Sequence, residues 1–232
     1  MSYIFSPEAV PALPLANSAD QFAVRRLYCV GRNYAAHARE MGSDPTRDVP
    51  FFFCKPADAV LPVPEGSAVA LPYPGMTSNF HHEVELVVAI GKAGRDIAVD
   101  QANDYVWGYA VGLDMTRRDL QGQLKDQGKP WEISKAFDLS APMGALYPVS
   151  QVGLISKAEI FLQVNQADRQ RSNIDQMSWS VPEIISHLSR YFELKPGDLI
   201  MTGTPEGVGA VVPGDVIDAG IAGLGSIRVR VE

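Results

Sequence analysis

Glycine and proline are spread along the whole chain, and this pattern limits the folds that the chain can adopt. The 232 residues include 20 glycines and 17 prolines. Both residue types end regular elements and form turns, so frequent punctuation of this kind favours many short strands over long helices. The chain also lacks the regular alternation of strands and helices that a doubly wound parallel sheet requires. We therefore predict a strand-rich α+β fold.

Hydrophobic patterning places the expected elements along the chain. A loop-like N-terminal extension is expected over residues 1–25, and a single domain over residues 26–232. We expect strands at residues 26–30, 51–54, 68–71, 83–90, 107–113, 158–165, 169–172, 199–202, 216–217 and 226–231. We expect helices at residues 99–105, 117–125 and 181–192, and a further short helix that Asn33 caps and that ends before Gly42.

Charge and composition exclude several classes of protein. The formal net charge is −7, which argues against a nucleic-acid partner because phosphate backbones attract basic surfaces. No apolar run approaches the roughly 20 residues of a membrane span, and the start of the chain does not have the pattern of a signal peptide. Cys29 and Cys54 are too few for a disulfide scaffold, so we expect two reduced, buried thiols in a cytoplasmic protein.

Three acidic side chains form a candidate metal site. Glu83 and Glu85 stand two positions apart on an expected strand, so both carboxylates point to the same side of it. Asp114 follows another apolar strand. Buried carboxylates that share one face repel each other, and a divalent cation with oxygen ligands resolves this conflict. The alternatives are a solvated strand end for the glutamates and a helix cap for Asp114.

A histidine and two lysines are further candidates. His37 and Glu40 are three residues apart, so on a helix they share a face and can form the pair of a general base and the carboxylate that orients it. Such pairs are also common on helix surfaces. Lys55 follows an apolar strand and Lys135 lies in the segment Ile-Ser-Lys-Ala-Phe-Asp; either lysine could instead be a solvated turn residue.

Several of these segments together resemble the fumarylacetoacetate hydrolase family, particularly its short bacterial members. The matching segments run in the family's order and cover about residues 26 to 232: residues 28–37 (YCVGRNYAAH), 53–56 (FCKP), 81–85 (HHEVE), 108–121 (GYAVGLDMTRRDLQ), 135–138 (KAFD) and 194–209 (LKPGDLIMTGTPEGVG). The resemblance implies a mixed β-roll fold, a homodimer and Mg²⁺ or Mn²⁺ held by Glu83, Glu85 and Asp114.

The resemblance also implies roles for the other candidates. His37 and Glu40 match the pair that activates water, and Lys135 matches a lysine beside the metal. The positions that match the family's substrate site and its rim are Arg118, Gln121, Lys55 and Thr204. By this resemblance, Arg118 and Gln121 are expected to hold the far carboxylate of a diacid substrate.

The implied activity is hydrolysis of the C–C bond of an acylpyruvate, a 2,4-diketo acid. Fumarylpyruvate, from aromatic-compound breakdown of the gentisate type, is the favoured substrate. Two alternatives lie within the family: decarboxylation of oxaloacetate and isomerisation of a 2-hydroxy-dienoate diacid. A protein that binds a keto acid without turning it over is the alternative from another class.

Overall fold

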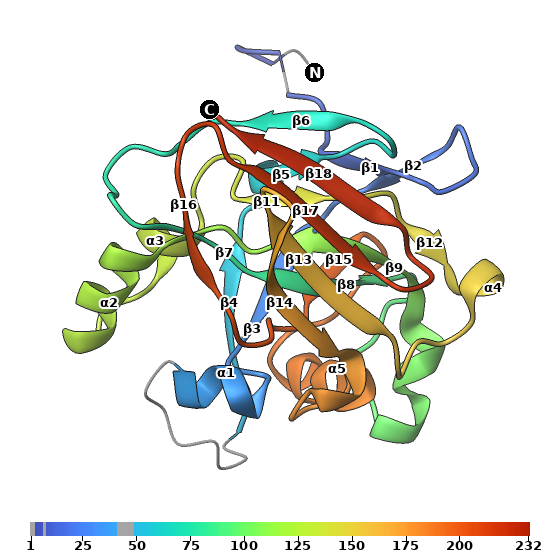
Figure 1. Cartoon of the computed structure of the whole chain (residues 1–232). Helices are drawn as coiled ribbons and strands as arrows, with labels where there is room; N and C mark the ends of the chain where they lie inside the picture. The colour runs from blue at the N-terminus through green and yellow to red at the C-terminus, as the bar shows by residue number, and fades with distance from the viewer. Residues whose placement is uncertain (1–2, 7, 41–48) are drawn as a thin grey trace.

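The computed structural model describes residues 3–6, 8–40 and 49–232. Most of its strands belong to two large β-sheets that lie one in front of the other (Figure 1). Within these residues the larger sheet has eight strands. They run in the order β4 (Phe51–Lys55), β3 (Arg26–Gly31), β15 (Asp198–Met201), β8 (Val84–Ile90), β9 (Val106–Leu113), β11 (Ala141–Met143) and β5 (Val60–Pro62), and β12 (Tyr147–Pro148) pairs with β9.

The second sheet has five of the described strands. Their order is β14 (Ala167–Asn173), β13 (Glu159–Val164), β17 (Val216–Ile221), β18 (Ser226–Val231) and β6 (Ala68–Leu71). Two smaller sheets contain β10 (Thr116–Arg117), β7 (Phe80–His82) and β16 (Gly209–Val211), and β1 (Ala12–Pro14) with β2 (Gln21–Ala23). Parallel pairs such as β3 with β15 occur beside antiparallel pairs such as β8 with β9, so the sheets are mixed and the predicted α+β class is confirmed.

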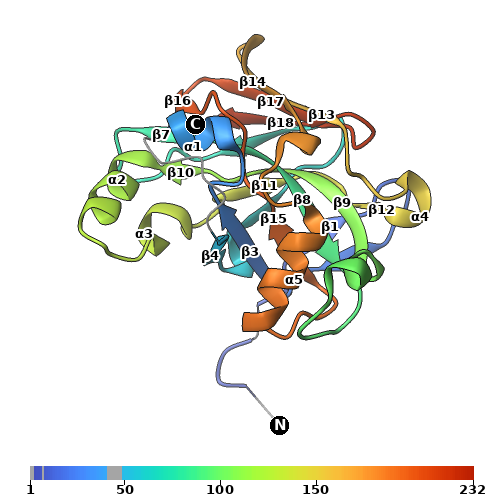
Figure 2. The same cartoon turned by 90° about the horizontal axis from the view of Figure 1, so that it is seen from below.

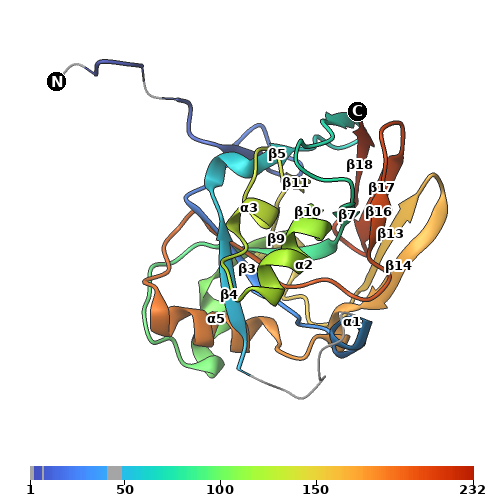
Figure 3. The same ribbon diagram turned by 90° about the vertical axis from the view of Figure 1, so that its left-hand side faces the viewer.

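Helices lie around the sheets. Seen from below, α5 (Val181–Tyr191) packs beneath the larger sheet, and its first turn is closed by a capping box between Ser180 and Glu183 (Figure 2). The helices α2 (Arg118–Asp126) and α3 (Glu132–Lys135) lie together on one side of the molecule (Figure 3). The other short helices are α1 (Ala35–Glu40), α4 (Val149–Val152), η1 (Ala57–Ala59), η2 (Val99–Tyr105) and η3 (Ile174–Gln176).

Strand β8 separates two hydrophobic cores. Its side chains alternate, so Leu86 and Val88 enter the core that is shared with the five-stranded sheet and α5. Val87 and Ala89 enter a second core on the opposite face of the larger sheet. Glu85 has the same parity as Val87, so its carboxylate lies on the face of the second core. The fold thus buries an acid next to apolar side chains.

Two expectations about exposed and irregular segments are wrong. The first 25 residues are not only loop, because they form the two-stranded sheet of β1 and β2 and bury Leu13 and Val24 in the second core. Cys29 is buried as predicted, but Cys54 is exposed. The reason is that β4, which carries Cys54, is the edge strand of the larger sheet, so its side chains are only partly covered.

Local boundaries also differ from the prediction. The helix near residue 33 begins at Ala35, and the Asn33 side chain bonds to distant backbone groups instead of capping it. Gly42, where that helix was expected to end, lies outside the described residues. The segment over 99–105 is a 3₁₀ helix, and Glu83 precedes the first residue of β8. Short strands such as β7 and β16 were not predicted, because two or three residues carry no periodic signal.

Candidate active site

The three predicted acids converge at one end of the central strands. Glu83 lies between β7 and β8, Glu85 lies in β8, and Asp114 follows the last residue of β9. The pairing of β8 with β9 brings these positions together, and the Asp114 N–H donates to the Glu83 carbonyl at 2.9 Å. One carboxylate oxygen of each acid lies within 4.8 Å of the others. All three residues are buried, so the alternative of a solvated strand end is wrong for the glutamates.

Three basic side chains surround this cluster. Lys135 Nζ lies 2.8 Å from Glu83 Oε2 and 2.6 Å from Asp114 Oδ2. Lys55 Nζ lies 2.9 Å from Asp114 Oδ1, and Arg118 forms an ion pair with Glu83. Both lysines are at most 2% exposed, so neither is a solvated turn residue. Buried ions need partners of this kind because the protein interior solvates charge poorly.

The surroundings shift the pKa values of Glu83 and Glu85 in opposite directions. Burial alone would raise the pKa of Glu83, but the charges of Lys135 and Arg118 outweigh burial and lower that pKa. Burial raises the pKa of Glu85 well above its usual value, and the neighbouring charges of Asp114 and Glu83 raise it further. Glu85 forms no ion pair with the described residues and accepts a hydrogen bond from the Gly203 N–H at 2.7 Å. When it is charged, its carboxylate is therefore the least compensated of the three acids.

The donor set fits a divalent cation. It consists only of carboxylate oxygens, which Mg²⁺ and Mn²⁺ prefer. Asp114 Oδ1 is buried and accepts no hydrogen bond of suitable geometry, although Lys55 Nζ is close to it. A bound cation would supply this atom with a partner and would balance the charge of Glu85. These residues can therefore hold such an ion.

The predicted histidine and glutamate pair forms on α1. His37 Nδ1 lies 3.1 Å from Glu40 Oε2, and the N–H of Gly207 donates to the same carboxylate at 3.2 Å. His37 is 6% exposed, whereas Glu40 is exposed. Because Glu40 occupies Nδ1, the other ring nitrogen, Nε2, is the one that can accept a proton.

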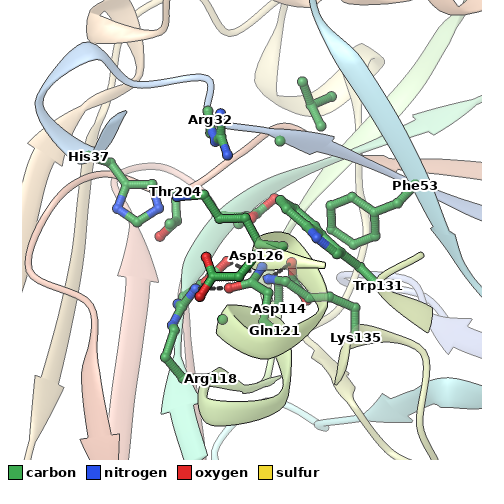
Figure 4. A pocket seen from close by; sticks show the side chains of 16 residues that line it. Arg32, His37, Phe53, Asp114, Arg118, Gln121, Asp126, Trp131, Lys135 and Thr204 are labelled. Atoms are coloured by element: carbon green, nitrogen blue, oxygen red, sulfur yellow. Dashed lines mark hydrogen bonds and ion pairs between the residues drawn. The ribbon is translucent and has the colours of Figure 1, made fainter. Parts of the chain in front are cut away.

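One cavity of about 160 Å³ joins these groups. Figure 4 shows His37 on one side of it and Arg118 on the other. The candidate residues that line the cavity are His37, Glu83, Glu85, Asp114, Arg118, Gln121, Lys135 and Thr204. Glu40 and Lys55 do not line it, but each contacts a residue that does.

The remaining candidates have clear contacts. The Thr204 hydroxyl donates to the Val84 carbonyl at 2.8 Å and accepts from Gln170 Nε2 at 2.8 Å, so it ties the cavity wall to β8. Gln121 accepts a hydrogen bond from Arg118. Arg118 and Gln121 thus form one group with Glu83.

The structure adds residues that the prediction did not single out. Asn33 is fully buried and ties the segment before His37 to distant loops. Gly203 donates to Glu85 and adopts a φ of +97°. A Cβ at Gly203 would lie 2.7 Å from the Asn33 side chain, so glycine is required there. Both residues stand in the quoted motif segments, which was the signal available in the sequence.

Comparison with known proteins agrees with this site. Residues 26–232 match the family described as fumarylacetoacetate (FAA) hydrolase C-terminal, and the chain belongs to this family. The strand-rich mixed fold and the family are therefore as the sequence predicted, and the fold surrounds a buried carboxylate cluster.

Particular relatives indicate which members it resembles. A crystal structure of fumarylpyruvate hydrolase from Pseudomonas aeruginosa in complex with Mn²⁺ and pyruvate is 63% identical, with a TM-score of 0.98, and covers 99% of each chain. A fumarylpyruvate hydrolase from Ralstonia sp is 46% identical over 181 residues, which are 78% of this chain and 92% of that protein. A mitochondrial oxaloacetate tautomerase from Homo sapiens is 44% identical over 208 residues, which are 90% of this chain and 92% of that protein.

These similarities decide between two predicted classes. They support an enzyme, a hydrolase of this family, and give no support to a protein that only binds a keto acid. They do not decide the substrate, because relatives of different activity match over most of the chain. Among the described residues, no helix is both long and apolar enough to span a bilayer.

Proposed function

We propose that this enzyme hydrolyses the C–C bond of an acylpyruvate, with fumarylpyruvate as the favoured substrate and fumarate and pyruvate as products. The observation that carries the proposal is that His37, already paired with Glu40, lines the same cavity as the three-carboxylate cluster. A group that can activate water and a site that can hold a divalent cation therefore face one space. The similarity to fumarylpyruvate hydrolases supports this substrate class.

Glu83, Glu85 and Asp114 would hold Mg²⁺ or Mn²⁺. When bound, this ion supplies positive charge that polarises a keto group and favours enolate formation. Lys135 adds a further positive charge beside the same acids. Arg118 and Gln121 line the cavity at this end and are suited to bind a substrate carboxylate, because a guanidinium and an amide both donate hydrogen bonds to carboxylates.

The role of His37 follows from its tautomer. Glu40 accepts the Nδ1 proton, so Nε2 takes a proton from a water molecule as the water oxygen attacks C4 of the substrate. The bond between C3 and C4 then breaks, and its electron pair remains on C3. C3 gains a proton and becomes the methyl group of pyruvate, while C4 becomes the carboxylate of the second product. One water is consumed, and the new acid releases one proton.

Oxaloacetate chemistry is the second candidate, because the tautomerase from Homo sapiens matches over 90% of this chain. Decarboxylation or tautomerisation of oxaloacetate needs no attacking water. His37 therefore separates these activities from hydrolysis, and the isomerase alternative differs because it would release no pyruvate.

The test is pyruvate release from a panel of fumarylpyruvate, acetylpyruvate and oxaloacetate by the Mn²⁺-loaded protein. We expect turnover of acylpyruvates, and we expect His37→Ala to lower their kcat/KM by about 100-fold or more, the size of general-base effects. Full acylpyruvate activity in His37→Ala, or release of pyruvate from oxaloacetate alone, would contradict the proposal. The control is Arg230→Gln, because Arg230 is exposed and does not line the cavity.

Three further predictions belong to this proposal. Mg²⁺ or Mn²⁺ as the working ion can be identified by metal analysis of the purified enzyme. A homodimer, expected from the family resemblance, can be checked by light scattering. A cytoplasmic location remains a prediction from the cysteine content.

A further inference from the structure

Arg32 lies at the mouth of the cavity and has no role in the mechanism above. It lines the cavity together with His37, and Figure 4 shows both on the side opposite Arg118. Its side chain is exposed, unlike those of the inner lysines. The cavity lining also includes Lys125 and Asp126 of α2, whose formal charges are opposite and equal. Arg32 therefore adds a net positive charge to the outer end of the cavity.

The backbone holds Arg32 in a costly conformation. Its φ is +57°, in the left-handed region that disfavours residues with a Cβ. The next residue, Asn33, fixes this geometry: its Nδ2 donates to the carbonyls of Trp179 and Thr202 at 2.9 and 2.8 Å. A non-glycine residue kept in this region by buried contacts is a feature typical of functional sites.

Aromatic rings connect Arg32 to the metal end. The Arg32 guanidinium lies 5.6 Å from the centre of the Phe51 ring. Phe51 and Phe53 both contact Trp131, with ring centres 5.2 and 5.9 Å apart. At the inner end, Lys135 Nζ lies 5.4 Å from the Phe53 ring. One wall of the cavity, formed in part by Phe53 and Trp131, is therefore aromatic and apolar, with Lys135 near its inner end and Arg32 near its outer end.

The inner basic groups are occupied by the acids of the cluster. Lys135 and Lys55 bind Asp114, and Arg118 binds both Glu83 and Gln121. Arg118 and Gln121 lie beside the carboxylate cluster in the cavity, so the keto-acid end of a substrate is the end that they can reach. A carboxylate at the far end of the same molecule needs a different cation.

We propose that Arg32 is a specificity-determining residue that binds the terminal carboxylate of a dicarboxylic acyl group. The acyl chain lies along the wall formed by Phe53 and Trp131. This assignment rests on the proposed function, and it replaces the expectation that Arg118 and Gln121 hold the far carboxylate. The enzyme then prefers acylpyruvates whose acyl group ends in an anion over those whose acyl group is neutral.

The test compares substrates that differ in this anion. In the Mn²⁺-loaded enzyme, Arg32→Gln should lower kcat/KM for fumarylpyruvate by about 10- to 100-fold, mainly through KM, because a charge-assisted hydrogen bond is lost. For acetylpyruvate, which has no terminal anion, kcat/KM should stay within about twofold. Arg32→Lys should recover part of the loss, and Arg230→Gln is the matched control with an exposed arginine elsewhere.

A binding experiment makes the result independent of turnover. Fumarate and crotonate differ in one carboxylate, and calorimetric titration of each into the Mn²⁺-loaded protein with pyruvate should show tighter binding of fumarate. Arg32→Gln should remove this preference. Equal losses for both substrates, or an unchanged fumarate preference, would overturn the assignment. If neither acylpyruvate is cleaved, the proposed function fails, and the preference for fumarate over crotonate still decides the role of Arg32.

Discussion

The most informative single substitution is Asn33→Ala. The Asn33 side chain is fully buried, and it forms three hydrogen bonds to backbone groups that are distant in the sequence. Nδ2 donates to the carbonyls of Trp179 at 2.9 Å and Thr202 at 2.8 Å, and Oδ1 accepts from the Trp179 N–H at 2.7 Å. These bonds hold the turn that carries Arg32 and leads to His37.

The magnitude follows from the bond count. Each hydrogen bond contributes about 1 kcal/mol net, so Asn33→Ala should lower the free energy of unfolding by about 3 kcal/mol. For a chain of this size, such a loss lowers Tm by about 6–12 °C. A helix cap would contribute only about 1 kcal/mol. The losses of stability expected for these two roles of Asn33, three buried hydrogen bonds or one helix cap, therefore differ by more than the error of a denaturation experiment.

A second variant distinguishes the roles by chemistry. Asn33→Asp keeps an oxygen that can cap a helix, but it replaces the Nδ2 donor with a carboxylate oxygen that faces two carbonyl oxygens. It should therefore cost at least as much as Asn33→Ala. The assay is urea unfolding followed by circular dichroism at one protein concentration, with chelator present, and the exposed Asn103→Ala serves as the control. An Asn33→Asp variant as stable as the unmodified protein would refute this reasoning.

Further predictions concern the metal site, a glycine and the N-terminal segment. Mn²⁺ at 100 times its Kd should stabilise the protein by about 2.7 kcal/mol, and Glu85→Gln should abolish most of this gain in a thermal melt. Gly203→Ala should cost at least about 1 kcal/mol and weaken Mn²⁺ binding, because the residue has a φ of +97° and contacts Asn33 closely. Leu13→Ala should lower the free energy of unfolding by about 2–5 kcal/mol, because Leu13 is fully buried. Phe5 is 85% exposed, so Phe5→Ser should change this free energy by no more than about 0.5 kcal/mol. Equal losses for the two variants would show that the N-terminal segment unfolds as one unit.

The elements that were predictable are those with a local, repeated signal. The apolar run after Glu85 predicts a buried strand, and these residues form most of β8. Pro182 in the first turn and the apolar periodicity of residues 181–192 predict α5. By contrast, β1 and β2 are three-residue strands that are stable only because they pack against the second core, so no local pattern marks them.

Single residues show the same limit. An apolar run of Phe and Cys predicts a buried strand, but Cys54 is exposed because β4 has a neighbour on one side only. An Asn before a helix predicts a cap, but Asn33 finds stronger partners in loops that lie 146 and 169 residues away. In both cases a long-range contact overrides a correct local tendency.

The sequence by itself determined which groups are available: three acids at strand ends, a histidine and glutamate at helical spacing, and the strand-rich character of the chain. Spacing is a local property, so these features could be read without coordinates. Only the tertiary structure decided which groups meet. Pairing of β8 with β9 brings Asp114 to Glu83 and Glu85, and Lys135 joins them from α3. The role of Arg32 is also a product of the fold, because its backbone conformation and its place at the cavity mouth depend on contacts that the chain makes only when folded.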